Sequence, residues 1–113
     1  MQLQVEERGD IRIVRVQVAK LTYPTLSPFF AEVRQLVEDG ARKLLIDLRP
    51  VTYIDSASIG CLMDIYRQTT ASGGELRLAG VNKRVETMLT MTGAHNFLKM
   101  FPDEAGALQS FGS

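Results

Sequence analysis

The feature that most constrains the fold is a strand–helix–strand pattern in the middle of the chain. Residues Lys43–Leu48 contain the continuous apolar run Leu44-Leu45-Ile46, which is typical of a central strand covered on both faces. A helical pattern spans Ser56–Ala71, ends at Ser72-Gly73-Gly74 and is followed by an alternating strand, Glu75–Ala79. Strands joined in this way lie parallel, with a right-handed crossover. The pattern therefore predicts an α/β domain.

The start of the chain predicts a β-hairpin. Residues 3–6 alternate apolar and polar side chains, Gly9-Asp10 is a turn signal, and Ile11–Val18 is rich in Ile and Val. We expect these two strands to pair antiparallel. The alternation slips between Ile13 and Val14, which indicates either a bulge or burial on both faces.

Three helices and a last strand complete the predicted elements. After a loop at Ala19–Thr25, Ser27-Pro28 is typical of a helix start, and Gly40 of a helix end. Asn82 is expected to cap the next helix, which ends at Thr92-Gly93. Next comes a short strand within Phe97–Phe101. The last predicted element is an amphipathic helix that begins at Pro102-Asp103.

Composition narrows the class of protein. The 113 residues suit one domain, and 45% apolar with 23% charged residues excludes an intrinsically disordered chain. Thirteen basic and 13 acidic residues give a net charge of zero, so there is no electrostatic basis for direct nucleic-acid binding. No apolar run approaches the roughly 20 residues of a membrane span, and the first residues lack signal-peptide features. We expect a cytoplasmic protein.

The single cysteine and the single histidine argue against an enzyme or a metal site. Cys61 excludes an internal disulfide and is expected to be a core residue. A serine nucleophile needs a base, and the only candidate is His95, while the Gly-x-Ser-x-Gly motif is absent. One Cys and one His are too few for the usual zinc sites, and no phosphate-binding loop is present. We expect no catalytic residue, no metal and no cofactor.

The loop before the central helix holds the strongest functional candidate. Asp55 and Ser56 are both common N-cap residue types. From the spacing alone, the simplest interpretation is that Ser56 is the N-cap, and Asp55 is the alternative. A hydroxyl at this point lies beside unpaired backbone N–H groups and the positive end of the helix dipole. A phosphate on Ser56 would therefore be tolerated by the fold.

These residues resemble a known family. The run Asp55-Ser56-Ala57-Ser58-Ile59-Gly60 is similar to the Asp-Ser-Ser/Ala/Thr-Gly-Leu-Gly motif of STAS domains, specifically of bacterial anti-sigma factor antagonists. The similarity extends from about Lys43 to the end of the chain, through Leu45–Leu48 with Val51–Ile54, Gly73–Leu76, Val81–Val85, Met91–Gly93 and Phe97. It implies a small mixed sheet of four or five strands with about four helices mainly on one side.

The resemblance also implies a mechanism. The unphosphorylated protein would bind a serine kinase that is also an anti-sigma factor, and so release a sigma factor. The kinase would use ATP to phosphorylate the serine after the motif aspartate, here Ser56, and a PP2C-type phosphatase would reverse this. Asp55, Ala57, Ser58 and Ile59 would surround the contact, with Thr22 from the preceding loop.

Two departures from the family pattern leave an alternative open. Ser58 stands where the family usually has glycine, and is either an alternative phosphoacceptor or, as we expect, a surface residue. Ala19–Thr22 lacks the glycine and the acid found in the corresponding family loop. The alternative is a STAS domain that does not switch, as a scaffold in a stress-signalling assembly or a subunit on a transporter ATPase.

Overall fold

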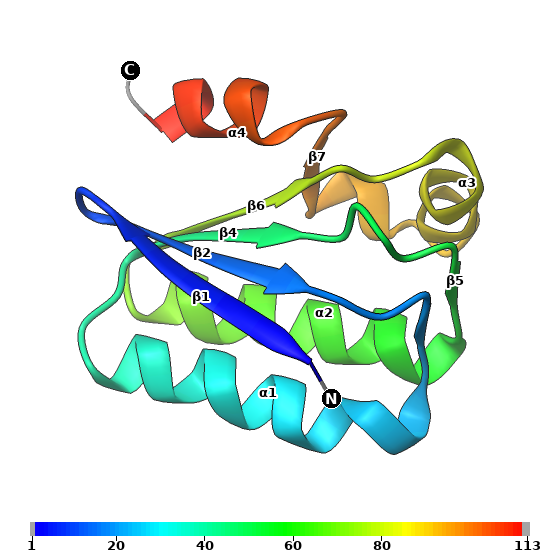
Figure 1. Cartoon of the computed structure of the whole chain (residues 1–113), viewed down its shortest axis with the longest axis horizontal. Helices are drawn as coiled ribbons and strands as arrows, with labels where there is room; N and C mark the ends of the chain where they lie inside the picture. Colours follow the sequence, from blue (N-terminus) through cyan, green and yellow to red (C-terminus); the bar gives the residue numbers. More distant parts are fainter. Residues whose placement is uncertain (1, 112–113) are drawn as a thin grey trace.

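The computed structural model describes residues 2–111, which form a five-stranded sheet flanked by helices (Figure 1). The strands are β1 (Leu3–Arg8), β2 (Ile11–Val16), β3 (Lys20–Leu21), β4 (Lys43–Asp47), β5 (Tyr53–Ile54), β6 (Glu75–Ala79) and β7 (Lys99–Phe101). The helices are α1 (Tyr23–Glu38), α2 (Ser56–Ala71), α3 (Lys83–Met91), the 3-10 turn η1 (Ala94–Asn96) and α4 (Glu104–Phe111).

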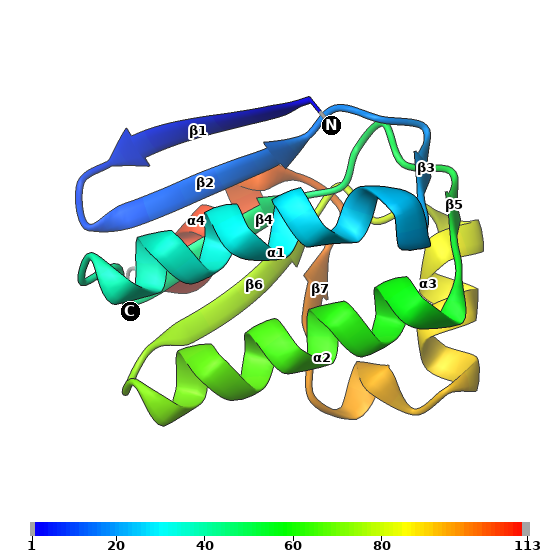
Figure 2. The same cartoon turned by 90° about the horizontal axis from the view of Figure 1, so that it is seen from below.

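The sheet has the order β1-β2-β4-β6-β7 and is mixed. β1 pairs antiparallel with β2, whereas β2, β4, β6 and β7 run parallel to one another. The predicted hairpin and the predicted parallel pairing of Lys43–Leu48 with Glu75–Ala79 are both confirmed. A second, two-stranded ribbon joins β3 to β5 beside the start of α2 (Figure 2).

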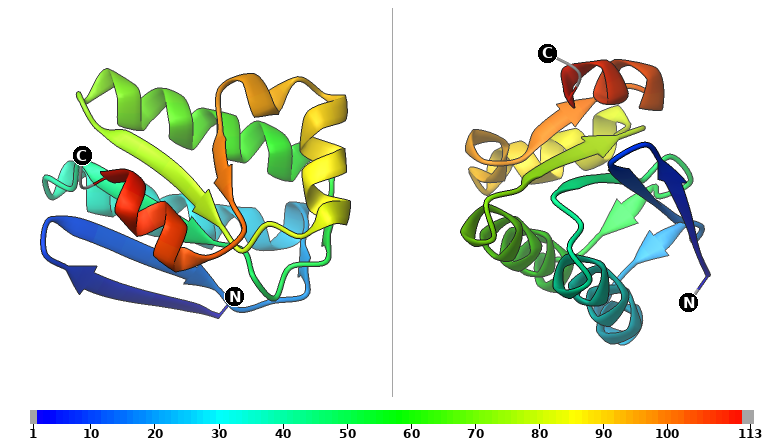
Figure 3. Two further views of the ribbon diagram at one scale, coloured as in Figure 1. Left: turned by 90° about the horizontal axis from the view of Figure 1, so that it is seen from above. Right: turned by 90° about the vertical axis from the view of Figure 1, so that its left-hand side faces the viewer.

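The helices cover the two faces of the sheet unequally. α1 and α2 lie side by side under one face, and α4 lies over the other (Figures 1 and 3). The larger core lies on the α1–α2 side and includes Val14, Phe29 and Leu62; the smaller one, under α4, consists of Ile13, Leu45, Ala79, Ala107 and Phe111. Because Ile13 and Val14 point into different cores and the β1–β2 register is unbroken, the phase slip reflects burial on both faces.

The start of α1 differs from the prediction. The helix begins at Tyr23, with Thr22 as its N-cap residue and Pro24 in the first turn, so Ser27-Pro28 does not start it. Pro28 lies inside the helix instead. At the observed start, the Tyr23 N–H finds an acceptor in Asp55, a residue distant in sequence.

The other predicted boundaries are close to those observed. α2 and β6 span the predicted residues, and the Asn82 side chain caps α3 by accepting a hydrogen bond from the Val85 N–H at 2.9 Å. Gly40, after α1, has a φ of 106°, a conformation that favours glycine. The predicted loop Ala19–Thr25 is wrong in part, since it holds β3 and the first turn of α1. Across the described residues, no helix combines the length and the apolar character needed to span a bilayer.

Candidate functional site

The carboxylate of Asp55 caps two helices at once. Its Oδ1 accepts a hydrogen bond from the Ser58 N–H at 2.8 Å, the N-cap interaction of α2. Its Oδ2 accepts one from the Tyr23 N–H at 2.9 Å, at the first residue of α1. The Thr22 side chain makes no cap hydrogen bond, so Asp55 provides the side-chain acceptor at both helix starts. The cap of α2 is therefore Asp55, and the interpretation of Ser56 as the cap is wrong.

The environment of Asp55 keeps its carboxylate ionised. Hydrogen bonding to the Ser58 hydroxyl is the main cause that lowers the pKa of Asp55 below its ordinary value, and the backbone N–H groups of Tyr23 and Ser58 add to it. The positive ends of two helix dipoles are therefore matched by one negative charge.

Ser58 lies in the interior, not at the surface. Its side chain is 0% exposed, and its hydroxyl lies within hydrogen-bond distance of the Leu21 carbonyl oxygen and of Asp55 Oδ1, the latter at 2.6 Å. The hydroxyl thus ties α2 to β3 from inside the first helical turn. The expectation that Ser58 is a surface residue is wrong, because its hydroxyl is enclosed between Leu21 of β3 and Asp55 at the start of α2.

Ser56 is the first residue of α2, and its side chain is exposed. At this position the backbone N–H groups of the first turn point out of the helix start toward solvent. A negatively charged group on the hydroxyl can reach this electropositive end without displacing a core side chain. Ser56 therefore combines accessibility with a place at a helix start.

The other predicted contact residues are less exposed than Ser56. Thr22, Ala57 and Ile59 are half-buried, and Ile59 packs in part against the larger core. Ala57 faces a groove of about 520 Å³ between α1 and α2, which also receives Tyr23 and Phe30. The structure brings Thr22 and Ala57 near the helix starts that Asp55 joins.

Two aromatic residues were missed by the sequence analysis. Tyr23 is 74% exposed at the start of α1, and Tyr53 is 38% exposed in β5, three residues before Ser56. Exposed aromatic side chains are common at protein–protein contacts. The signal for Tyr23 was present in the sequence, since Thr22-Tyr23-Pro24 is itself a helix-start pattern.

The histidine considered as a catalytic base lies elsewhere in the fold. His95 belongs to η1 after α3 and is exposed, and no hydrogen bond joins it to Ser56 in the described chain. Cys61 is 9% exposed on α2, and burial raises the pKa of its thiol to about 11. Within residues 2–111, no cluster of three His, Cys, Asp or Glu side chains is arranged to hold a metal.

Comparisons with known proteins agree with this architecture. The family model of the STAS domain matches residues 2–107. The anti-sigma F factor antagonist of Paenibacillus polymyxa is 22% identical over 109 residues, which cover 96% of this chain and 92% of that protein.

Solved structures show the same fold. The crystal structure of an anti-sigma factor antagonist from Mycobacterium paratuberculosis has a TM-score of 0.89 at 19% identity and covers 99% of this chain and 94% of the other. SpoIIAA of Bacillus in its phosphorylated form has a TM-score of 0.75 at 16% identity, with 97% and 99% covered. At these identities the likeness establishes the fold, which is the mixed sheet with four helices that the sequence predicted. Together with the family match over residues 2–107, it shows that the chain belongs to the STAS domain family.

Proposed function

We propose that this protein is an anti-sigma factor antagonist that switches partners through phosphorylation of Ser56. In this scheme the unphosphorylated form binds an anti-sigma factor with serine kinase activity and so releases a sigma factor. The kinase transfers the γ-phosphoryl group of ATP to the Ser56 hydroxyl, and a PP2C-type phosphatase removes it. The exposed position of Ser56 at the start of α2 is the observation that carries the proposal.

The electrostatics of the helix start support a switch that acts on binding and not on folding. A phosphoserine adds about −1.5 to −2 charges near neutral pH. In the free protein this charge is exposed to water and lies at the positive end of α2. In a complex the same charge, next to the ionised Asp55, would be desolvated or left without a partner, which costs an interface several kcal/mol.

The surroundings of Ser56 supply a contact surface for the kinase. Exposed Tyr23 and Tyr53 and half-buried Ala57 and Thr22 lie around the two helix starts. Aromatic anchors of this kind often contribute most of an interface's binding energy. We propose that Asp55 acts in this surface mainly as the group that fixes Ser56, Tyr23 and Thr22 relative to one another.

The test is phosphorylation by each serine kinase of this type from the source organism. The protein is incubated with kinase and ATP, and intact mass and peptide mapping are recorded. One added phosphate on Ser56, lost in Ser56→Ala, is expected. Ser72→Ala, at the other end of α2, is the matched control and should be phosphorylated as wild type.

Binding of the kinase supplies the second readout. Ser56→Asp should weaken binding at least about a hundredfold, equivalent to about 2.7 kcal/mol, while Ser56→Ala and Ser72→Asp should bind like the wild type. Tight binding without phosphate transfer, unaffected by Ser56→Asp, would contradict the switch and support a scaffold or subunit that does not switch.

A further inference from the structure

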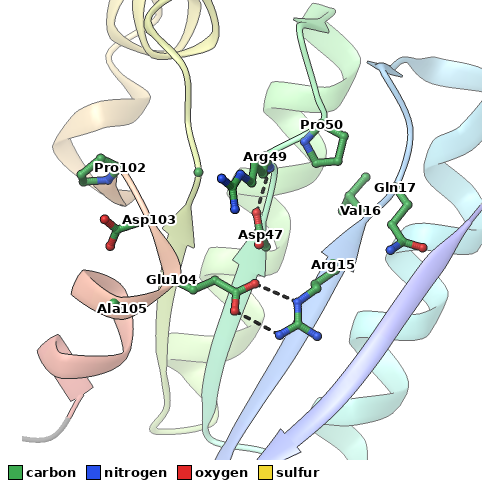
Figure 4. Close-up of a pocket in the computed structure, with 11 residues that line it drawn as sticks. Arg15, Val16, Gln17, Asp47, Arg49, Pro50, Pro102, Asp103, Glu104 and Ala105 are labelled. Carbon is green, nitrogen blue, oxygen red and sulfur yellow. Dashed lines mark hydrogen bonds and ion pairs between the residues drawn. The ribbon is translucent and has the colours of Figure 1, made fainter.

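A cavity of about 580 Å³ lies at the carboxyl ends of the parallel strands (Figure 4). Its walls include Val16 and Asp47, the last residues of β2 and β4, and Gly80, which directly follows β6. Residues 102–105, which lead from β7 into α4, form another wall. In open α/β sheets, ligands bind in the crevice outside the carboxyl ends of the strands, and the volume suits a small molecule. The cavity is therefore a candidate ligand site.

A buried carboxylate lines this cavity. Asp47 is 7% exposed, and its Oδ1 accepts a hydrogen bond from the Arg49 N–H at 2.8 Å. Gly80 packs so closely against it that a Cβ there would lie 2.8 Å from Oδ1. Within residues 2–111, no N–H or O–H group donates to Oδ2, and no basic side chain forms an ion pair with Asp47. Since charges buried in proteins are normally paired, Asp47 is an acid that the described chain leaves without a cation.

Arg15, which also lines the cavity, is engaged by other acids. Its Nε and Nη2 donate to Glu104 at 2.8 and 3.0 Å, and its Nη1 donates to Glu6 at 2.8 Å. These hydrogen bonds hold the guanidinium between β1 and the start of α4. Asp103 adds a third acid to the cavity, beside Glu104 and Asp47. Because the one engaged arginine does not balance these acids, an added cation is favoured beside Asp47.

The cavity also presents a cation that the chain does not engage. The side chain of Arg49 is exposed, and in the part of the chain that the structure describes its guanidinium forms no hydrogen bond or ion pair. Figure 4 shows this guanidinium between the end of β4 and the segment that leads into α4. A guanidinium binds a carboxylate through paired N–H donors. The cavity therefore offers one anion and one cation, two residues apart in the sequence, to a ligand.

We propose that this cavity binds a small zwitterion of the amino-acid type, with its ammonium group on Asp47 and its carboxylate on Arg49. The ammonium group donates to Oδ2 of Asp47 and offsets the charge of the neighbouring Glu104. The carboxylate accepts hydrogen bonds from the Arg49 guanidinium. The proposal does not depend on the role of Ser56.

The form of the cavity favours a zwitterion over an ion of a single charge. An ion of one sign pairs with either Asp47 or Arg49, whereas a zwitterion pairs with both and enters without net charge. A free amino acid carries its two charged groups on one carbon atom, so both can reach side chains that are two residues apart. Val16, Pro50 and Pro102 supply apolar wall for the rest of the ligand.

NMR titration of the whole protein tests the proposal. Each standard amino acid is added alone at about 10 mM, a concentration that reveals millimolar dissociation constants. The solution is kept at about pH 8, because burial raises the pKa of Asp47 to about 6 and the carboxylate must be ionised. At least one amino acid should shift the amide signals of Gly80 and Ala105 saturably and leave those of α1 unchanged. The corresponding amine without the carboxylate should bind at least about tenfold more weakly.

Variants locate the two charges of the ligand. Arg49→Gln should weaken binding at least about tenfold, and the fold does not rely on this guanidinium. Asp47→Asn keeps an acceptor for the Arg49 N–H and should weaken binding to a similar degree. Arg34→Gln and Asp39→Asn are the matched controls, because both residues are exposed at α1, under the opposite face of the sheet, and these variants should bind like the wild type.

Three results would overturn the proposal. The first is the absence of a saturable shift at Gly80 and Ala105 with every amino acid tested. The second is binding by Arg49→Gln or by folded Asp47→Asn that equals binding by the wild type. The third is equal binding of the amine that lacks the carboxylate, since the ligand would then make no use of Arg49.

Discussion

The carboxylate of Asp55 accepts the backbone N–H of Tyr23 at 2.9 Å, across 32 residues of chain. This contact makes the start of α1 dependent on the loop that begins α2. Since the other carboxylate oxygen caps α2 itself, a single side chain sets the relative position of the two helix starts. The region around Ser56 is therefore held by both hydrogen bonds of Asp55, and a phosphate added there would meet a surface that is already organised.

Replacing Asp55 should remove a hydrogen-bond acceptor from the starts of both α1 and α2. Asp55→Ala removes both acceptors and, at about 1 kcal/mol for each cap, should lower the free energy of unfolding by about 2 kcal/mol. Asp55→Asn keeps one acceptor oxygen and places an NH2 group against the second N–H, so it should fall between wild type and Asp55→Ala. Urea unfolding measures these differences. Equal stability of Asp55→Asn and the wild type would show that one of the two hydrogen bonds contributes nothing.

Ser58→Ala should destabilise the protein and change its behaviour in acid. The single Ser58 hydroxyl proton is shared between the Leu21 carbonyl oxygen and Asp55 Oδ1, and its removal from this buried site costs about 1–3 kcal/mol. The Ser58 hydroxyl is also the main cause of the lowered pKa of Asp55. Because this pKa is lowered, ionised Asp55 stabilises the native state at pH values above the pKa of aspartate in the unfolded chain. This stabilisation is lost as the pH falls, so the stability gap between wild type and variant should narrow below about pH 4.

The measurement is urea unfolding at a series of pH values from neutral to acidic. Ser27→Ala, on the exposed surface of α1, is the control and should follow the wild-type curve. A gap between wild type and Ser58→Ala that widens in acid would contradict the assigned direction of the Asp55 shift.

The sequence predicted the regular elements better than the contacts between them. The apolar run of Lys43–Asp47 and the periodicity of Ser56–Ala71 arise from local residue patterns, so β4 and α2 could be placed closely. The burial of Ser58 could not, because it depends on the Leu21 carbonyl of a strand only two residues long. Likewise, nothing local connects Arg15 with Glu104, which pair only when α4 packs on the sheet.

A negative charge at Ser56 should leave the fold intact. The helix dipole favours an anion at the first residue of α2 by about 0.3–1 kcal/mol, and repulsion from Asp55 offsets part of this. The stability of Ser56→Asp should therefore lie within about 0.5 kcal/mol of wild type. Circular dichroism and urea unfolding measure helicity and stability, and the same measurements apply to mass-verified phosphoprotein.

Ser72→Asp provides the opposite case on the same helix. Ser72 is the C-cap residue of α2 and is exposed, so an aspartate there meets the negative end of the dipole and should be destabilising by about 0.3–1 kcal/mol. Loss of helical signal in Ser56→Asp, with Ser72→Asp unaffected, would mean that the helix start does not accommodate charge as described.

Cys61 should react slowly in the native protein. Its thiol is nearly buried and has a pKa of about 11, so at about pH 8 the thiolate fraction is at least a hundredfold lower than for an exposed cysteine with a pKa near 8.5. Ellman's reagent should accordingly label native protein at least about a hundredfold more slowly than protein in urea. Because Cys61 also lines the groove between α1 and α2, faster native labelling would show that this groove opens in solution.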